Sequence, residues 1–338
     1  MKKKGKGIAC MYYPIGSTGK PNASGAFIKM HNDGTVVVSI GAVDEGQGST
    51  TAMAQIVAEE LGIDFAQIRM ITADTELTPF DYGTGACRVT YVQGNAVKKT
   101  AASAKKMLQA AAAAKLNVAN PDRLVLKSGK IMLEGFSERS MSISEAAFYS
   151  ERVLGKPVMA AESFTPATFP IDPETGHGRP FETYVYATQI AEVEVDTETG
   201  AVDVVKLIAV HDCGKAINPM LVEGQIEGGV VMGLGYALME DLIEDGTSGG
   251  VINNSFVDYY LPTAADIPHE LTVDYVEQAE KNGPFGAKGM AEPTQLPTAP
   301  AIINAIYDAV GVRIYDLPAT PEKVLRAIKQ KYPNNKIS

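Results

Sequence analysis

The chain has 338 residues, of which 45% are hydrophobic and 21% charged, a composition typical of globular proteins and long enough for two cores. Its net charge of −10 argues against nucleic acid or an anionic membrane as the main partner, because both require clustered lysine and arginine. No apolar run is long enough to span a membrane, and no apolar core of a signal peptide follows the basic residues after Met1, which predicts a cytoplasmic protein. Three separated cysteines and four scattered histidines predict neither a disulfide framework nor a metal held directly by side chains.

The first 24 residues are rich in glycine, proline, serine and asparagine and predict an irregular opening segment. This segment contains Tyr12 and Tyr13, whose side chains either pack against another part of the protein or line a pocket. Residues 26–30 and 35–40 then predict a β-hairpin, because an Asn-Asp-Gly turn sequence separates them.

A glycine-rich loop containing Gly46, Gln47 and Gly48 connects this hairpin to a predicted helix. Glycines let a ligand approach the backbone, and the free N–H groups of a first helical turn attract anions. The Gln47 amide can both donate and accept hydrogen bonds. The loop lacks the spacing of the dinucleotide-binding and P-loop fingerprints, so it predicts either an anion site or an ordinary strand-to-helix turn.

A second glycine-rich loop, with Gly83 and Gly85, precedes a long alanine-rich helix predicted over residues 94–114. Two such junctions in one half of the chain suggest that they hold two polar ends of one extended ligand. Arg88 in this loop is either a phosphate ligand or a surface residue. Short strands and one short helix complete this half, at residues 68–72, 123–126, 130–133 and 144–149.

Five prolines and several glycines mark residues 151–182 as a connection between two subdomains, residues 1–150 and residues 183–338. Alternating apolar residues after this connection predict a long hairpin over residues 187–196 and 201–211.

A glycine-containing helix is predicted over residues 222–240, with Gln225 in its first turn. Each internal glycine costs about 1 kcal/mol relative to alanine. Close backbone contact with another element or with a ligand is therefore predicted by Gly228, Gly229, Gly233 and Gly235. A strand at residues 269–275 follows.

The loop around Glu292 combines three glycines, Lys288 and a single carboxylate. Pro293 restricts the residue before it to extended conformations, which predicts that Glu292 lies on a loop. A buried helix is expected to begin near Thr298, acting as N-cap, and a last helix follows Thr320. Glu292 is thus either a catalytic base anchored by a buried helix or a solvated turn residue, and Lys288 either lowers its pKa, holds an anion or lies on the surface.

Four segments taken together resemble the molybdenum hydroxylase family of xanthine dehydrogenases and aldehyde oxidases. They are VDEGQG at residues 43–48, GNAV at 94–97, HDCGKAINP at 211–219 with QIEGG at 225–229, and KGMAEP at 288–293. The resemblance covers almost the whole chain and is to the C-terminal half of the molybdopterin-binding subunit. It implies an α+β fold of two mixed α/β subdomains, joined by the proline-rich connection and with the second carrying the Glu292 loop.

The resemblance also implies roles for single residues. Glu292 stands at the position of the catalytic base, which takes a proton from the oxygen that attacks an electron-poor carbon. Tyr12 and Tyr13 lie in the segment on the substrate side of the pocket, and Cys87 stands where serine is common in relatives. The positions that match cofactor-binding residues are Gln47, Gly48, Ala86, Cys87, Arg88, Val89, Gln225 and Lys288.

Within the family, a molybdopterin subunit divided between two polypeptides is similar to that of nicotinate dehydrogenases. This similarity implies hydroxylation of nicotinate to 6-hydroxynicotinate with water as the oxygen source and NADP as the electron acceptor. The implied cofactor is molybdopterin cytosine dinucleotide with molybdenum, carrying a sulfido or selenido ligand. The implied partners are a second, larger molybdopterin subunit, an iron–sulfur subunit and an FAD subunit. The alternatives are a hydroxylase subunit for purines, other N-heterocycles or aldehydes, and a non-catalytic scaffold subunit.

Overall fold

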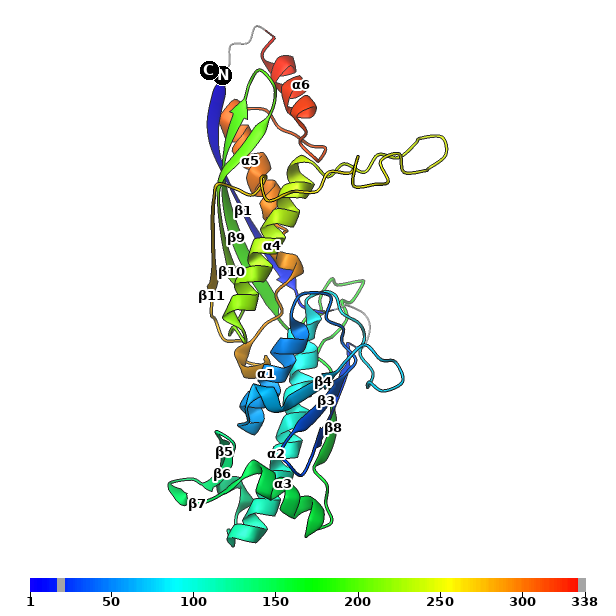
Figure 1. Ribbon diagram of the computed structural model, residues 1–338. Helices are drawn as coiled ribbons and strands as arrows, with labels where there is room; N and C mark the ends of the chain where they lie inside the picture. The colour runs from blue at the N-terminus through cyan, green and yellow to red at the C-terminus, as the bar shows by residue number, and fades with distance from the viewer. Residues whose placement is uncertain (17–21, 334–338) are drawn as a thin grey trace.

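The computed structural model describes residues 1–16 and 22–333 and shows an elongated molecule with two lobes (Figure 1). Residues 17–21, part of the predicted irregular opening segment, lie outside the described residues. The described strands form three sheets, in the orders β4-β3-β2-β8, β5-β6-β7 and β1-β9-β10-β11. The first two sheets belong to one lobe and the third belongs to the other (Figure 1).

The main sheet of the first lobe is built around the predicted hairpin of β2 (Ser24–Met30) and β3 (Val36–Ile40), which pair antiparallel. β4 (Ile68–Ile71) adds to β3 in parallel, and β8 (Met159–Phe164) adds to β2 antiparallel. The hairpin prediction is therefore confirmed, whereas β8 forms inside the segment that the sequence presented as a connection.

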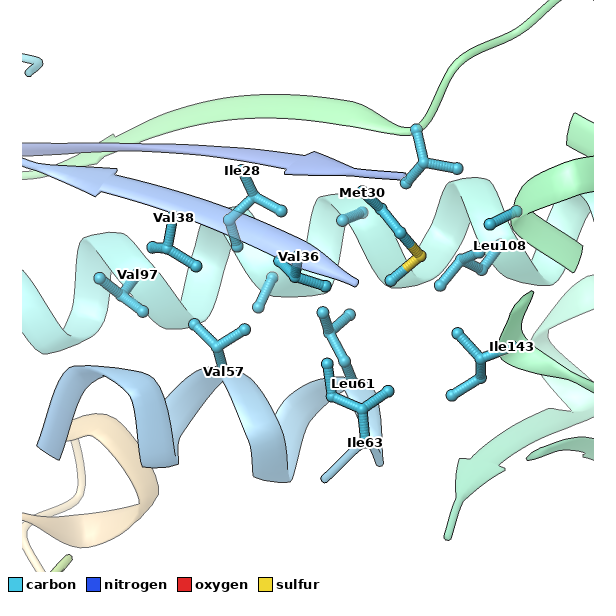
Figure 2. Close-up of a cluster of buried hydrophobic side chains, with 14 of the residues drawn as sticks. Ile28, Met30, Val36, Val38, Val57, Leu61, Ile63, Val97, Leu108 and Ile143 are labelled. Atoms are coloured by element: carbon cyan, nitrogen blue, oxygen red, sulfur yellow. The ribbon is translucent and has the colours of Figure 1, made fainter. Parts of the chain in front are cut away.

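Two helices, α1 (Ser49–Leu61) and α2 (Gly94–Leu116), cover one face of this sheet (Figure 2). Alternate residues of the strands and one stripe of each helix meet there, as their periods of 2 and 3.6 residues require. The side chains that fill this core include Ile28, Met30, Val36, Val38, Val57, Leu61, Val97 and Leu108. This burial supplies the main hydrophobic stabilisation of the first lobe.

The end of the first lobe carries the small sheet of β5 (Leu124–Lys127), β6 (Lys130–Leu133) and β7 (Phe136–Ser142), followed by α3 (Ile143–Arg152). Ser142 and Glu145 form a capping box at the start of α3. β7 is mostly exposed and polar, so it lacks the alternating apolar pattern by which strands are predicted. Short 3₁₀ turns precede β4 and β5, at Phe65–Gln67 and Pro121–Arg123.

The second lobe contains the predicted long hairpin of β9 (Tyr184–Asp196) and β10 (Val202–Asp212). β11 (Glu270–Val276) lies parallel to β10. β1 (Lys2–Pro14) pairs antiparallel with β9 along its whole length, so the prediction that this segment is irregular is wrong for residues 2–14.

Helix α5 (Thr298–Val310) explains the glycines of β1. A side chain at Gly5 would place its Cβ 2.2 Å from the Ala305 carbonyl oxygen, and one at Gly7 would place it 2.1 Å from the Ala301 carbonyl oxygen. The glycines therefore let the helix lie directly on the strand. The lysines that alternate with them pair with acidic residues of β9, as when Lys6 Nζ lies 2.7 Å from Glu192 Oε1.

The predicted subdomain boundaries differ from the sheet boundaries at two places. β1 lies in residues 1–150 but belongs to the sheet of the second lobe, and β8 lies in residues 151–182 but completes the sheet of the first lobe. The chain therefore crosses between the lobes more than once. Both differences arise because strand pairing between distant segments leaves no local trace in the sequence.

Three helices complete the second lobe: α4 (Pro219–Leu238), α5 (Thr298–Val310) and α6 (Pro321–Lys331). α4 begins earlier than predicted, at a cap formed by Asn218, so Gln225 lies in its second turn and not in its first. α5 begins at Thr298 as predicted, but the Thr298 hydroxyl does not cap it and donates to Gln189 Oε1 instead (2.7 Å).

The glycines of α4 divide into two groups. A Cβ at Gly229 would lie 1.8 Å from Thr294 Oγ1, and one at Gly233 would lie 2.5 Å from Thr298 Cβ, which confirms the predicted close approach. Gly224 and Gly228 instead face open space. One side of α4 thus packs closely against Thr294 and Thr298. The side with Gly224 and Gly228, here called the bare side, has no close neighbour at these two glycines.

We expect Gly229→Ala to destabilise the chain by about 1–3 kcal/mol, because the added methyl group must displace Thr294. Gly228→Ala is the matched control on the same helix and should be neutral or stabilising by up to about 1 kcal/mol, because alanine favours the helix and meets no neighbour. Urea unfolding of the purified chain measures both. Equal effects of the two substitutions would contradict the packing described for Gly229.

A long loop between α4 and β11 extends away from the body of the second lobe (Figure 1). Phe256 and Val257 in this loop are 81% and 80% exposed, and Ile252 and Tyr260 are also largely exposed. Contiguous exposed apolar side chains of this kind mark interaction surfaces. Among the described residues, no helix is both long enough and apolar enough to cross a membrane.

Candidate functional site

A cavity of about 580 Å³ lies where loops of the two lobes meet. Residues from 45–52 and 84–90 of the first lobe line it together with residues from 213–232 and 287–295 of the second. The two glycine-rich loops, the bare side of α4 and the Glu292 segment therefore share one cavity. Predicted site residues that line it are Gln47, Gly48, Cys87, Arg88, Val89, Gln225, Lys288 and Glu292, whereas Ala86, Tyr12 and Tyr13 do not.

Glu292 begins a short 3₁₀ turn (Glu292–Thr294), so it lies outside the α-helices but not on an irregular loop as predicted. Its Oε2 accepts hydrogen bonds from the Cys87 backbone N–H (3.0 Å) and from the Cys87 thiol. The Ala291 N–H in turn donates to Cys87 Sγ (3.2 Å). The carboxylate is half-buried and lines the cavity, so one of its oxygens is fixed by the opposite lobe.

The first glycine-rich loop already has an internal anion. The Asp44 carboxylate accepts N–H bonds from Gly46 (2.9 Å), Gly48 (3.1 Å) and Thr50 (3.0 Å), in the first turn of α1. Burial alone would raise the pKa of Asp44, but these bonds outweigh burial and lower it. The prediction that these N–H groups are free to receive a ligand anion is therefore wrong for this turn.

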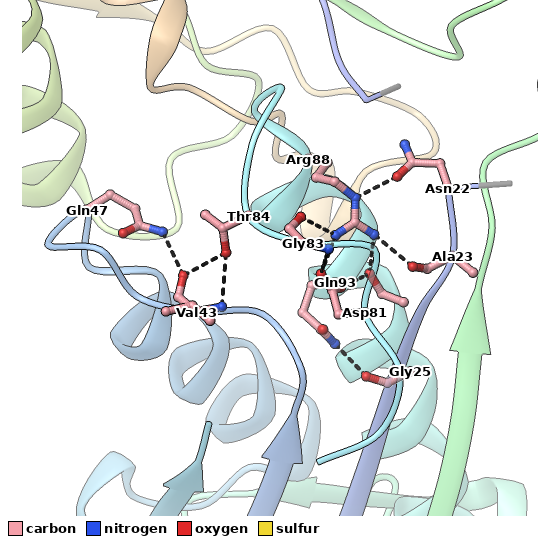
Figure 3. A network of polar contacts seen from close by, with 11 residues as sticks. Asn22, Ala23, Gly25, Val43, Gln47, Asp81, Gly83, Thr84, Arg88 and Gln93 are labelled. Carbon is pink, nitrogen blue, oxygen red and sulfur yellow. Dashed lines mark hydrogen bonds and ion pairs between the residues drawn. The ribbon is translucent and has the colours of Figure 1, made fainter. Parts of the chain in front are cut away.

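Gln47 holds the same loop to its neighbour. Its Nε2 donates to the Val43 carbonyl oxygen (3.2 Å) and to Ser49 Oγ (3.1 Å), and Thr84 of the second glycine-rich loop donates to the same Val43 oxygen (2.9 Å). Figure 3 shows Gln47 and Thr84 meeting at Val43. The expectation that the two glycine-rich loops serve one site is consistent with this contact.

Arg88 differs most from the prediction. Its side chain is 1% exposed, and its N–H groups all form hydrogen bonds inside the protein. Its Nη1 lies 2.5 Å from Asp81 Oδ1, its Nε donates to Asn22 Oδ1, and its remaining N–H groups donate to three further oxygens (Figure 3). A guanidinium has five N–H groups, so none is left for a phosphate. Arg88 is neither a surface residue nor a phosphate ligand; it holds the second loop in shape.

Helical structure after this loop begins at Val89, as a π-helical turn (Val89–Gln93) that continues into α2. This start lies five residues before the predicted one at Gly94. The N-terminus of the helix is therefore at the cavity wall, where Val89 and Thr90 lie. The predicted loop residues Ala86 and Cys87 immediately precede this start, both with positive φ.

Lys288 is also largely buried and engaged. Its Nζ lies 2.6 Å from Asp212 Oδ2 and donates to the Tyr184 carbonyl oxygen (2.9 Å). Its charge is thus balanced by Asp212, and its burial shows that the alternative of a surface lysine is wrong. One ammonium N–H remains for a ligand in the cavity that Lys288 lines.

The two tyrosines of β1 point to opposite faces of the sheet, as consecutive strand residues do. Tyr12 is exposed and its ring lies 6.2 Å from that of Tyr184, away from the cavity. Tyr13 packs with the cluster that contains Cys87 and Ala291. Burial, followed by the charge of Glu292, raises the pKa of Tyr13 to about 12, so its hydroxyl is neutral and lies near the carboxylate.

A buried polar link supports the Glu292 turn and was missed in the sequence. The Gln189 amide donates to the Thr294 carbonyl oxygen (2.7 Å) and contacts His211 Nε2 (3.2 Å), while Thr298 donates to it. Burial lowers the pKa of His211 to about 4, so the imidazole is neutral and its Nε2 can accept. The signal for this link is a polar side chain at the inward positions of two otherwise apolar alternating strands.

Comparison with known proteins decides the family. The model of the molybdopterin cofactor-binding domain matches residues 1–268. The chain belongs to this family. Its predicted resemblance to the molybdopterin-binding subunits of molybdenum hydroxylases is confirmed.

Relatives of this family member include a xanthine dehydrogenase molybdenum-binding subunit of Escherichia coli O157:H7, 34% identical over 95% of the chain and 42% of the relative. The nicotine 6-hydroxylase large subunit of Paenarthrobacter nicotinovorans is 34% identical over 97% of the chain and 41% of the relative. The crystal structure of quinoline 2-oxidoreductase from Pseudomonas putida 86 matches 97% of the chain and 42% of its own, with a TM-score of 0.87 and 25% identity. The α+β fold is confirmed, and the chain spans about two fifths of the length of these relatives.

The cavity suits an extended polar cofactor of the kind that defines the family. Gly46, Gly85 and Gly228 line the cavity and would each have room for a Cβ, so their backbones border open space. Within the described residues, the Gln225 amide has no hydrogen-bond partner, although it lines the cavity. Open backbone groups and a free amide can form hydrogen bonds to the polar edge of a pterin. The described residues hold no cluster of three or more potential metal-binding side chains.

Proposed function

We propose that this chain is a molybdopterin-binding subunit of a molybdenum-dependent hydroxylase. A single observation carries the proposal: one cavity collects Gln47, Cys87, Gln225 and Glu292 from four distant segments of a chain in the molybdopterin cofactor-binding family. A scaffold subunit would have no reason to retain this arrangement. When bound, the cofactor supplies oxygen transfer and two-electron chemistry.

In this proposal the residues of the cavity have three roles: they bind the cofactor, position an amide and accept a proton. Gln225, Gly228 and the backbone of Gly85 and residues 87–89 hold the cofactor, a cytosine dinucleotide form, and Lys288 offers its remaining N–H. Gln47 positions an amide beside the reacting centre. Glu292 accepts the proton of the attacking oxygen, since a half-buried carboxylate in a cavity is a suitable general base.

The proposed substrate is nicotinate, an electron-poor N-heterocycle, and the proposed product is 6-hydroxynicotinate. The relative named nicotine 6-hydroxylase supports this substrate class. A purine is the second candidate, which the relative named xanthine dehydrogenase favours. Product analysis of the purified complex with nicotinate, xanthine and hypoxanthine tests the choice. Absence of nicotinate turnover alongside purine turnover would replace nicotinate with a purine.

The proposed partners are a second, larger molybdopterin subunit, an iron–sulfur subunit and an FAD subunit that passes electrons to NADP, all in the cytoplasm. The exposed apolar loop around Phe256 and Val257 supports the existence of a partner surface. Co-purification with mass spectrometry identifies the partners and the nucleotide of the cofactor. A complex without molybdenum would instead support a scaffold subunit.

We expect Gln225→Ala to reduce the molybdenum content of the purified complex several-fold, because the substitution removes an amide that faces the cavity. The neighbouring Glu227→Ala is the control, since Glu227 lies on the same helix but does not line the cavity. Metal analysis per complex measures both variants. Unchanged molybdenum in Gln225→Ala would remove Gln225 from the cofactor site.

A further inference from the structure

The Cys87 side chain and backbone meet the Glu292 turn at three points. The Cys87 N–H donates to Glu292 Oε2 (3.0 Å), the thiol donates to the same oxygen, and the Ala291 N–H donates to Cys87 Sγ (3.2 Å). These contacts form a closed ring between two segments 205 residues apart in the chain. Among the described residues, Glu292 Oε1 has no such protein partner, so the two carboxylate oxygens are not equivalent.

The backbone around Cys87 is held in an uncommon conformation to make these contacts. Ala86 and Cys87 have φ values of 49° and 51°, a left-handed region that residues with a Cβ rarely occupy. Gly289 faces the Cys87 carbonyl so closely that a Cβ on it would lie 1.7 Å from the oxygen. Such conformations persist only where the surroundings impose them, and they concentrate at functional sites.

We propose that Cys87 is a positioning residue for Glu292: its N–H and S–H groups fix Oε2 and leave Oε1 as the oxygen that accepts a proton from the cavity. The inference rests on the proposed role of Glu292 as the base. It goes further by assigning the orientation of the carboxylate to one thiol on the opposite lobe.

The thiol must stay protonated to donate, and its surroundings ensure this. Burial, then the charge of Glu292 and the hydrogen bond to it, raise the pKa of Cys87 well above its usual value of 9.0. Tyr13, a second titratable group near the pair, is kept neutral by burial and by the charge of Glu292. Arg88, next in sequence, directs its charge to Asp81 instead. Cys87 is therefore a donor throughout the neutral pH range.

Thiol alkylation tests the contact between Cys87 and Glu292 in an assay that requires no catalytic turnover. We use the complex purified from cells that lack the molybdenum cofactor, treat it with neutral iodoacetamide at pH 8.5, and quantify each cysteine peptide by mass spectrometry. Glu292→Gln should speed alkylation of Cys87 about tenfold, because loss of the neighbouring charge lowers its pKa and raises the thiolate fraction. Cys213 is the internal control: burial and acidic residues other than Glu292 raise its pKa to about 12, so its rate should not change. Equal rates for Cys87 in the two proteins, including no labelling in either, would overturn the proposal.

The second test measures the steady-state kinetics of the complex that contains the molybdenum cofactor. Cys87→Ala keeps the backbone N–H but loses the thiol, and should lower kcat about 10-fold to 100-fold at unchanged KM, as small misplacements of catalytic groups do. Cys87→Ser restores a donor and should recover most of the loss. Equal kcat in Cys87→Ala and the wild type would overturn the positioning role. If the complex lacks turnover altogether, the proposed function fails while the alkylation result still decides the contact.

Discussion

Replacing Glu292 with Gln is expected to abolish turnover while leaving the molybdenum content of the complex unchanged. The amide keeps the size of the side chain but cannot accept a proton at neutral pH, and loss of a general base lowers rates about 10²–10⁴-fold. Single-turnover reduction of the complex by substrate, together with metal analysis, measures the two quantities separately.

The matched control for this experiment is Glu45→Gln, because Glu45 lines the same cavity but is exposed on the first glycine-rich loop. It should retain turnover close to that of the wild type. If Glu292→Gln stays active, the base lies elsewhere. Loss of molybdenum in Glu292→Gln would instead assign the carboxylate to cofactor retention.

Replacing Arg88 with Met is expected to have the largest effect on stability. The substitution leaves the Asp81 carboxylate, 1% exposed, without its ion-pair partner, and breaking a buried pair costs about 3–5 kcal/mol. Chemical denaturation of the chain measures the free energy of unfolding. Arg123→Met, at an exposed position, should change it by less than about 0.5 kcal/mol.

A double variant separates lost charge pairing from lost packing. Adding Asp81→Asn to Arg88→Met removes the unpaired charge and should recover part of the lost stability, so the two effects are not additive. A phosphate-binding Arg88, in contrast, would leave stability unchanged on substitution and reduce only cofactor retention. That outcome would contradict the buried network shown in Figure 3.

The elements that the sequence predicts well are those with local patterns. The β2–β3 hairpin, the β9–β10 hairpin and helices α1, α2, α5 and α6 all show turn sequences, caps or apolar periodicity within their own residues. The family follows from short motifs in a fixed order, so it too could be predicted. The cavity brings together residues of the motifs at 43–48, 211–229 and 288–293, whereas residues 94–97 lie in α2 outside its lining, and the individual roles remain predictions.

The elements that were missed depend on distant partners. β1 begins with lysine and glycine at residues 2–7, two residue types of low strand propensity. Its pairing with β9 is supported there by contacts of the lysines with Glu192 and Glu194 and by α5, which lies on the glycines. Arg88 and Asp44 look like free ligands in the sequence, because nothing there indicates which oxygens and N–H groups will surround them.

The closed ring between Cys87 and Glu292 also fixes when the site can exist during synthesis. The first lobe, whose main sheet ends with β8 at Phe164, can fold while the rest of the chain is still being translated. β1 can pair only after β9 has been synthesised, and the cavity lining is incomplete until residues 287–295 have left the ribosome. Under the proposed function, the cofactor would therefore bind after residues 287–295 are synthesised, because a chain that ends before Glu292 lacks this part of the cavity lining.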